Sequence, residues 1–348
     1  MSQTLIDRLH NRIDLRSRLF CWCPPGSTKV TCYVLDHAQT SFPSGSNETY
    51  LTLCGFDSNT PRFYRCIESL VLEREVFLEF QFPTPTLASL PPITGTSKVE
   101  YTNGVETAKN RFKTGDLSKV VLAQRQGIAT SSLNIFACLQ TLCKSPDRYH
   151  YLFHLPEEET WIGSSPELFF KSNNDAFETM ALAGTRLAGD KNDWGDKELK
   201  EQAIVSQFIN SQLIALGFSN VTVHPRLNKA SGSIEHICSP ITAQIPENLN
   251  WLEVFKRLHP TPALAGYPQK AAIQFIKENE GFDRELFGGF MGIVSPKEME
   301  LFVNIRCAKL GQERCYVYAG AGLNDSSSPL EEWHETNNKL EVMLNLLN

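Results

Sequence analysis

The period of the hydrophobic pattern changes several times along the chain. Val105, Ala108 and Phe112 have the three-to-four-residue spacing of one helical face. Elsewhere short apolar or alternating runs, separated by turn residues, predict strands. The predicted helices are 102–114, 196–216, 271–279 and 331–347. The predicted strands are 30–35, 76–82, 119–124, 149–155, 160–162, 177–183, 221–224, 234–245, 287–294, 301–308 and 315–321.

The order of these elements favours an α+β fold. Strands and helices do not alternate regularly, so a large, mainly antiparallel sheet with helices packed outside fits better than a doubly wound sheet. No internal repeat is visible. The proline-rich segment 82–96 is the best candidate for a linker or a surface crossing. We therefore divide the chain into residues 1–95, in which we find no chemistry, and residues 96–348, and we expect both to form one structural unit.

Composition narrows the function. The 348 residues are 41% hydrophobic and carry a net charge of −6, which gives no general attraction to nucleic acid or to an anionic membrane. An anionic small molecule would need local cations or a bound metal. No run of 18 apolar residues occurs, so we expect no membrane span. The ten cysteines are scattered without zinc-site spacing, and reduced, buried thiols predict a cytoplasmic protein.

Two predicted helices present acidic faces. Glu198 and Glu201 are three residues apart, as are Glu332 and Glu335, and Lys339 follows Glu335 by four. Residues at these spacings share a helix face. Four carboxylates without a Cys or His cluster suit a hard cation such as Mg²⁺. The alternative is that these faces are solvated surface with an ordinary helical ion pair.

Two glycine-containing turns follow predicted strands, at 183–186 (AGTR) and 319–322 (AGAG). Glycine allows a ligand to approach the backbone closely, but two tight turns explain the same pattern. The dinucleotide-binding fingerprint is absent, because no third glycine and no helix follow. Lys119 and Glu167 would each be taken for surface residues if they were considered alone.

Nine motifs, taken together, give a resemblance. The chain resembles the chorismate-utilising enzymes, and among them the isochorismate synthases. The motifs, in order, are KVVLAQR (119–125), GSSPELFF (163–170), ALAGTR (181–186), KEQAIV (200–205), IEHICSPI (234–241), LHPTPALAGYP (258–268), FDRELFGGFMGIV (282–294), VNIRCAKL (303–310) and AGAGLNDSSSPLEEWHETNNKLEVML (319–344). The resemblance implies the chorismate-binding enzyme fold, with residues 96–348 as the catalytic domain.

The resemblance also implies a magnesium site and a substrate pocket. Glu201 and Glu335 would bind Mg²⁺ directly, while Glu198 and Glu332 would hold its water ligands. The metal would take the ring carboxylate of chorismate. The implied substrate contacts are Arg306 on the enolpyruvyl carboxylate, Lys339 near the ring carboxylate, Gly184, Thr185 and Gly320 lining the carboxylate pockets, His236 near the ring, and Ala263 and Leu264 packed against it.

The implied chemistry assigns roles to the two remaining residues. Chorismate becomes isochorismate when water attacks C2 and the C4 hydroxyl leaves. In similar enzymes the lysine at position 119 is the general base and the glutamate at position 167 is the general acid. Lys119 must then be neutral and Glu167 protonated, which requires the environment to lower one pKa and raise the other.

Two positions discriminate within the family. Anthranilate synthases usually carry glutamine where this chain has Lys119, and aminodeoxychorismate synthases usually carry lysine where it has Ala183. The pattern therefore predicts an isochorismate synthase, which is an isomerase, without an amidotransferase subunit. The resemblance implies a monomer. A salicylate synthase, which would differ mainly around 259–266, stays open. A non-catalytic relative is a further alternative. The motifs do not distinguish between menaquinone and siderophore biosynthesis as the pathway that the product enters. A metal-dependent hydrolase lacks any supporting motif.

Overall fold

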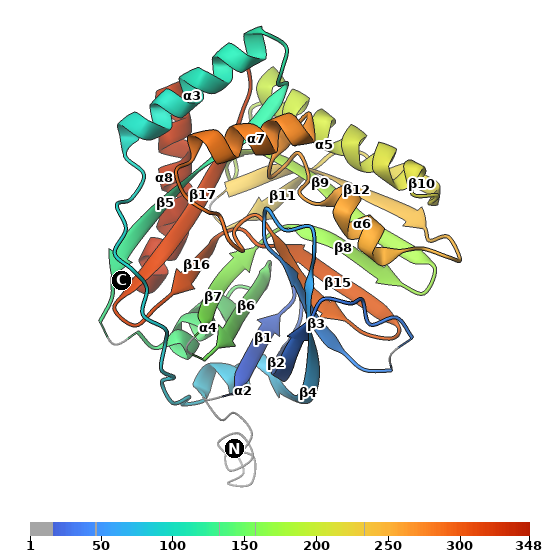
Figure 1. Cartoon of the computed structure of the whole chain (residues 1–348), viewed down its shortest axis with the longest axis vertical. Helices are drawn as coiled ribbons and strands as arrows, with labels where there is room; N and C mark the ends of the chain where they lie inside the picture. The colour runs from blue at the N-terminus through green and yellow to red at the C-terminus, as the bar shows by residue number, and fades with distance from the viewer. Residues whose placement is uncertain (1–16, 46, 132, 157, 233) are drawn as a thin grey trace.

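The computed structural model describes residues 17–348 except 46, 132, 157 and 233 (Figure 1). The first 16 residues of the predicted N-terminal part therefore lie outside the described residues. Among those described, no helix is long and apolar enough to cross a membrane.

Within the described part of the chain, one sheet of 17 strands forms the centre of the molecule. Neighbouring strands follow the path β12, β9, β8, β15, β14, β3, β4, β2, β1, β6, β7, β16, β17, β5, β13, and both β10 and β11 pair with β12. Each of these pairings is antiparallel, which confirms the predicted fold class. The strands are β1 (Arg18–Cys23), β2 (Lys29–Gln39), β3 (Tyr50–Cys54), β4 (Arg62–Glu73), β5 (Lys119–Ala129), β6 (Tyr149–Leu155), β7 (Glu159–Ser165), β8 (Leu168–Asn173), β9 (Ala176–Leu187), β10 (Ser219–Val223), β11 (Leu227–Ser231), β12 (Ile234–Gln244), β13 (Gly266–Tyr267), β14 (Phe290–Val294), β15 (Glu298–Val303), β16 (Cys307–Leu310) and β17 (Arg314–Leu323).

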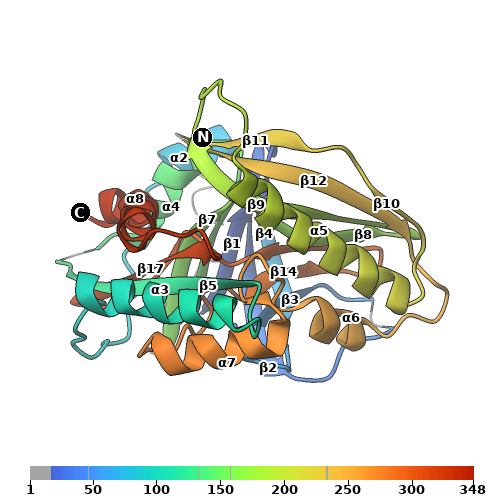
Figure 2. The same ribbon diagram turned by 90° about the horizontal axis from the view of Figure 1, so that it is seen from above.

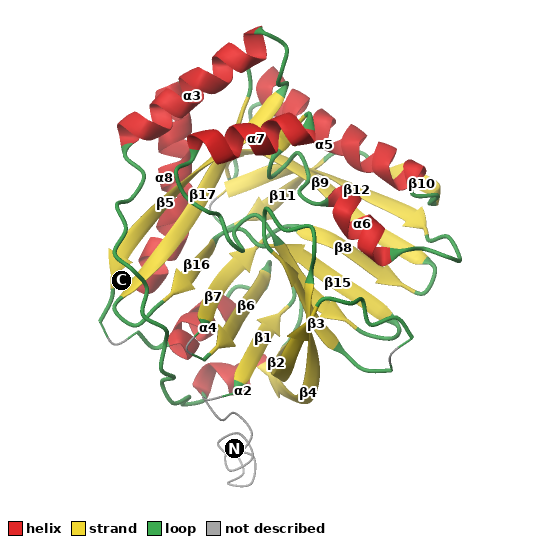
Figure 3. Cartoon of the chain, viewed as in Figure 1, coloured by secondary structure: helices red, strands yellow, loops and turns green. Residues whose placement is uncertain are grey.

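The helices pack on the outside of this sheet (Figures 2 and 3). Helix α3 packs on β5 and on α8, α5 packs on β9, and α8 packs on β17. Each of the two acidic helices, α5 and α8, thus packs on the strand that precedes it in the chain, β9 or β17. The helices are α2 (Arg74–Glu79), α3 (Lys98–Lys113), α4 (Ile135–Cys143), α5 (Asp196–Ala215), α6 (Trp251–Leu258), α7 (Gln269–Asn279) and α8 (Pro329–Leu347).

The apolar core has three parts. One lies under α3, α5, α6 and α7, and a second lies under α2, α4 and α8 and contains five buried cysteines of the N-terminal strands and α4. The third is rich in aromatic rings, among them Trp161, which stacks on Tyr318 with centroids 5.5 Å apart. Burial on this scale holds the sheet and helices rigidly around the site described below.

The first strands belong to the same sheet. β1 pairs with β6, and β3 pairs with β14. The segment 80–97, which contains the predicted linker, has neither helix nor strand, yet it buries Phe82, Leu87 and Leu90. It is therefore a packed crossing over the surface of the fold.

Three predicted elements were wrong in detail. The predicted strand 76–82 is the short helix α2, which buries Phe77 completely, because a short apolar run does not distinguish the two structures. The predicted strand 301–308 is two strands, separated at Arg306, whose φ is +49°. The pair of predicted glycine-containing turns, 183–186 and 319–322, lies within strands, since β9 continues to Leu187 past an irregular register opposite 235–237 and β17 continues to Leu323.

The first predicted helix begins earlier than expected. Its N-terminal residue is Lys98, because Ser97 and Glu100 form a capping box in which each side chain accepts a hydrogen bond from the other's backbone N–H. That box is visible in the sequence as Ser-x-x-Glu, so the signal was available.

Candidate active site

A cavity of about 950 Å³, its mouth included, opens between the acidic helices and the sheet. It is lined by 13 of the 14 residues that the sequence singled out; the exception, Glu332, forms an ion pair with the lining residue Lys197. The lining residues from the prediction are Lys119, Glu167, Gly184, Thr185, Glu198, Glu201, His236, Ala263, Leu264, Arg306, Gly320, Glu335 and Lys339. Segments far apart in the chain thus meet in one place.

Lys119 begins β5 and is only 1% exposed. Its backbone is fixed by β13, where Gly266 has a φ of +131° and an added Cβ would lie 2.2 Å from the Lys119 carbonyl oxygen. Burial lowers the pKa of Lys119, although Glu201 and Glu167 act in the opposite direction. The amine is therefore shifted toward its neutral form.

Glu167 lies in the connection between β7 and β8 and is 5% exposed. Its carbonyl oxygen accepts a hydrogen bond from the Val303 N–H at 3.0 Å, which ties it to β15. Burial raises the pKa of Glu167 to about 8, and this outweighs the opposing charge of Lys119. Glu167 is therefore protonated at neutral pH.

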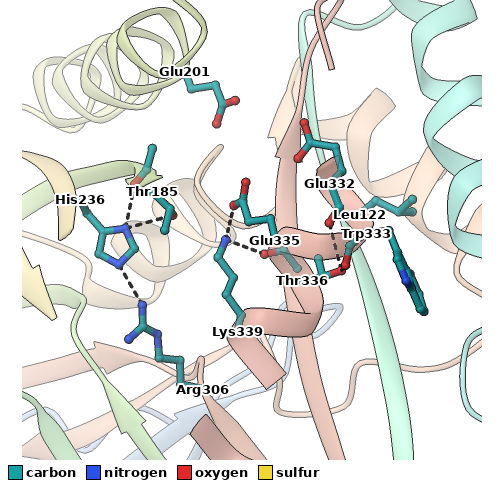
Figure 4. Close-up of polar contacts among 12 residues, drawn as sticks. Leu122, Thr185, Glu201, His236, Arg306, Glu332, Trp333, Glu335, Thr336 and Lys339 are labelled. Atoms are coloured by element: carbon teal, nitrogen blue, oxygen red, sulfur yellow. Dashed lines mark hydrogen bonds and ion pairs between the residues drawn. The ribbon is translucent and has the colours of Figure 1, made fainter. Parts of the chain in front are cut away.

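Three carboxylates on α5 and α8 each have a lysine partner. Glu201 Oε2 lies 3.7 Å from Lys119 Nζ. Glu335 Oε1 accepts a hydrogen bond from Lys339 at 2.7 Å. Glu332, which is 1% exposed, accepts a hydrogen bond from Lys197, and this ion pair joins the two helices. Figure 4 shows the Glu201 and Glu335 side chains reaching toward the same space.

These carboxylates repel one another. Burial is the main cause that raises the pKa of Glu201. The charges of Glu335 and Glu332 raise it further, while Lys119 and Lys197 act in the opposite direction. Burial and Glu335 likewise raise the pKa of Glu332. Burial alone would raise the pKa of Glu335, but Lys339 holds it below its usual value. A cluster of oxygen donors whose charges oppose one another is what a divalent cation stabilises.

The carboxylate oxygens on α5 and α8 suit magnesium, provided that these side chains rearrange. Within the described part of the chain, no three Asp, Glu, His or Cys side chains already converge closely enough to hold a metal ion. Three lysines, Lys119, Lys197 and Lys339, contact these carboxylates. Binding of Mg²⁺ would require these oxygens to exchange lysine partners for the cation, and oxygen-only donors on two helices are suited to it.

At the other end of the cavity, hydrogen bonds orient the Arg306 guanidinium, which could bind an anion. Its guanidinium donates to Ser231 Oγ at 3.0 Å and to His236 Nε2 at 2.9 Å. His236 Nδ1 lies 2.7 Å from the Gly184 carbonyl oxygen and 3.2 Å from Thr185 Oγ1 (Figure 4). Burial and Arg306 lower the pKa of His236 to about 3, so the ring is neutral, with Nδ1 donating and Nε2 accepting.

The backbone is strained where these groups meet. Arg306 adopts a φ of +49°, a region that non-glycine residues seldom occupy. Its carbonyl oxygen accepts a hydrogen bond from the Ser164 N–H at 3.0 Å. Gly184 has a φ of +69°, and a Cβ there would lie 2.9 Å from Glu198 Cβ. The absence of a side chain at Gly184 lets α5 approach β9.

Sequence reasoning missed four lining residues with polar or aromatic side chains. Lys197 precedes Glu201 by four residues on α5, so its position on the acidic face could have been read from helical spacing. The others gave no local signal, since they reach the cavity only through the sheet. The missed residues are Lys197, Arg284, Phe287 and Tyr318.

Gly322 leaves no room for a side chain beside Glu201 and Lys119. An added Cβ would lie 2.4 Å from Glu201 Oε2 and 3.3 Å from Lys119 Cε. We expect Gly322→Ala to displace both groups and to lower kcat about 10- to 100-fold, because misplacement of reacting groups by about 1 Å has effects of this size. Steady-state kinetics would measure it. Gly95→Ala, where the nearest atom is 3.4 Å away, is the control, and an equal loss in both variants would contradict a local effect.

Comparisons with known proteins agree with the fold. The menaquinone-specific isochorismate synthase MenF from Escherichia coli superposes with a TM-score of 0.80 at 24% identity, over 97% of this chain and 90% of that one. DhbC from Bacillus anthracis superposes with a TM-score of 0.78 at 25% identity, over 98% and 99% of the two chains. The architecture of this chain is thus that of these solved enzymes.

The sequence places the chain in a family. Residues 39–348 match the chorismate-binding enzymes. Isochorismate synthase EntC of Escherichia coli is 35% identical over 247 residues, which is 67% of this chain and 63% of that relative's length. The chain belongs to the chorismate-binding enzyme family, as the sequence motifs predicted.

Proposed function

We propose that this protein is a magnesium-dependent isochorismate synthase, an isomerase that converts chorismate to isochorismate. The observation that carries the proposal is the pairing of Lys119 and Glu167 in one cavity, with pKa shifts in opposite directions. A base that is easily neutral and an acid that stays protonated are what the addition of water and the loss of hydroxide require. The resemblance to isochorismate synthases supports the same reaction.

Substrate binding uses the two ends of the cavity. The enolpyruvyl carboxylate pairs with Arg306, whose planar guanidinium matches a carboxylate and is oriented by the neutral His236. The ring carboxylate lies toward α5 and α8, near Lys339. Ala263 and Leu264 form an apolar wall for the ring. The buried surroundings exclude bulk water from the reacting carbons.

Magnesium would be held by Glu201 and Glu335 directly and by Glu198 and Glu332 through water. When bound, it would offset the charge of the ring carboxylate, make the diene more electrophilic, and weaken the hold of Glu201 on the Lys119 ammonium.

Two proton transfers then complete the reaction. Lys119 takes a proton from water as its oxygen bonds to C2, the two ring double bonds shift, and the C4–O bond breaks. Glu167 gives its proton to the departing hydroxide, which leaves as water. One water enters and one leaves, so the product has the mass of the substrate. Proton exchange with solvent restores both residues.

The chain's own residues favour water over ammonia as nucleophile. Position 183, where a lysine is usual in aminodeoxychorismate synthases, is an alanine that lines the cavity without an amino group. Position 119 carries a lysine, where glutamine is usual in anthranilate synthases. A salicylate synthase, which also eliminates pyruvate, is the alternative outcome. The protein is proposed to act as a monomer without an amidotransferase subunit and in the cytoplasm, and its product could serve menaquinone or siderophore synthesis.

The test is product analysis. Purified protein is incubated with chorismate, with and without Mg²⁺ and with and without ammonium. The products are separated by chromatography, and their masses are determined by mass spectrometry. We expect a magnesium-dependent isomer of unchanged mass. Salicylate with pyruvate would assign the chain to the salicylate synthases, and turnover that requires ammonium would make it an aminating enzyme. No turnover in any condition would favour a non-catalytic relative.

The metal assignment gives a separate prediction. Glu335→Gln should raise the Mg²⁺ concentration needed for half-maximal activity at least about tenfold, because one anionic ligand is lost. Glu341→Gln changes an exposed residue of the same helix and should leave that concentration unchanged. Magnesium titrations of both variants measure it; a shared shift, or none in Glu335→Gln, contradicts the assignment.

A further inference from the structure

A second cavity adjoins the first. It encloses about 960 Å³, its mouth included, and shares Thr185, Arg306, Glu335 and Lys339 with the catalytic cavity. Its remaining wall comes from the residue before β6, the end of β9, the β11–β12 hairpin and α8. These further lining residues are Arg148, Arg186, Ser231, Ile234, Glu331, His334, Asn338 and Val342.

Arg148 is a buried cation in this wall whose hydrogen-bonding capacity is incompletely used. It directly precedes β6 and is 8% exposed, yet its Nε finds no hydrogen-bond acceptor within the described residues. The paired carboxylate, Asp147 Oδ2, is 3.6 Å from Nε. Gly232, whose φ is +65°, leaves room for the guanidinium, because a Cβ there would lie 2.3 Å from Arg148 Nη2. The hairpin thus makes space for a cation that is weakly paired.

Arg306 is the second such cation. Its hydrogen bonds go to the neutral groups Ser231 and His236, and no ion pair joins it to a described carboxylate. Burial first, and then the charge of Arg148, lower the pKa of Arg306. Both guanidinium groups line this cavity and lie at the β11–β12 hairpin, Arg148 beside Gly232 and Arg306 on Ser231.

The other charges of the wall are already compensated or exposed. Arg186 donates to Glu235 at 2.6 Å, and Lys339 donates to Glu335 at 2.7 Å. Glu331 and His334 are exposed on α8. The excess positive charge is thus concentrated at Arg148 and Arg306, and buried unpaired charge is destabilising unless an anion joins it.

We propose that the second cavity is an anion-binding vestibule, in which a carboxylate of the incoming dicarboxylate docks between Arg148 and Arg306 before the ring enters the catalytic cavity. This rests on the proposed function, which supplies a dianionic substrate. In a protein of net charge −6, a local positive wall overcomes the general repulsion of a dianion. Such focusing raises the rate of productive encounter and depends on salt. Arg148 is a positioning residue here and takes no part in proton transfer.

The kinetic test compares variants of the full chain with chorismate at low and high ionic strength. Arg148→Gln should lower kcat/KM about tenfold and weaken its salt dependence, with kcat within about twofold of wild type. Lys270→Gln removes the same charge from an exposed position on α7 and should match wild type. Asn338→Glu places a negative charge at an exposed position of the vestibule, where folding is not at risk, and should lower kcat/KM several-fold.

A binding test separates this proposal from the proposed function. Benzene-1,3-dicarboxylate, an unreactive dicarboxylate, is titrated into the same variants by calorimetry. We expect Arg148→Gln and Asn338→Glu to weaken its binding several-fold and Lys270→Gln to leave it unchanged. If the wild-type protein makes no isochorismate but binds the dicarboxylate more tightly than Arg148→Gln does, the proposed function is refuted and the vestibule is supported. If the wild-type enzyme turns over normally but neither kcat/KM nor binding changes in Arg148→Gln and Asn338→Glu, the vestibule proposal is wrong and the proposed function stands. A loss confined to kcat would also overturn the vestibule proposal.

Discussion

Replacing Lys119 with methionine is expected to lower kcat for isochorismate formation about a thousandfold, the range over which a general base contributes. Methionine has a similar length and suits the buried start of β5, so the strand should stay in place. The variant lacks the amine that takes the proton from water, while Glu167 and Arg306 remain. Chromatographic measurement of isochorismate at saturating chorismate and Mg²⁺ gives kcat directly.

Lys171→Met is the matched control for that experiment. Lys171 lies on β8, away from the cavity, and its partner is Glu300 at 3.0 Å. The control should keep kcat within about twofold, because surface ion pairs contribute little. A Lys119→Met enzyme with near-normal kcat would show that another group removes the proton, and the assignment of Lys119 as base would then be wrong.

The local parts of this fold could be predicted from the sequence. Strand β6 has the predicted bounds, and helices α5 and α8 begin and end within two residues of prediction, because their apolar periodicity is long and regular. The i, i+3 spacing also placed Glu198 with Glu201 and Glu332 with Glu335. These are properties of single elements, which the neighbouring sequence determines.

The cavity itself could not be derived from spacing. Lys119, Glu201 and Glu335 come from β5, α5 and α8, and only the packing of those elements brings them together. Resemblance to a family supplied the grouping. It did not supply the lysine partners of the carboxylates, the left-handed conformation of Arg306, or the approach of Arg148 to Arg306, since each depends on contacts across the sheet.

The same burial produces both pKa shifts that the proposed chemistry needs. Desolvation disfavours the charged form of either group, so it lowers the pKa of Lys119 and raises that of Glu167. Their mutual attraction opposes both shifts, and so do the contacts of Lys119 with Glu201. Burial in the cavity therefore shifts both groups toward their neutral forms, although Lys119 also contacts the Glu201 carboxylate.

Glu167→Gln should lower kcat about 100- to 1,000-fold and stabilise the fold at alkaline pH. In wild type, the acid with a pKa of about 8 is available below pH 8, so activity should fall about tenfold per pH unit above it. The folded pKa lies above the unfolded value of 4.5. The contribution of Glu167 to stability is thus fully present below about pH 4.5 and is lost as the pH rises to about 8.

Glutamine does not ionise, so the variant escapes that loss. Urea unfolding should show Glu167→Gln more stable than wild type at pH 9, by on the order of 3 kcal/mol, with the difference vanishing near pH 4. Glu178→Gln, at an exposed position of β9, should change neither activity nor the pH dependence of stability. Equal stability of Glu167→Gln and wild type at both pH values would mean that Glu167 is ionised in the folded protein. The leaving hydroxide would then need another acid.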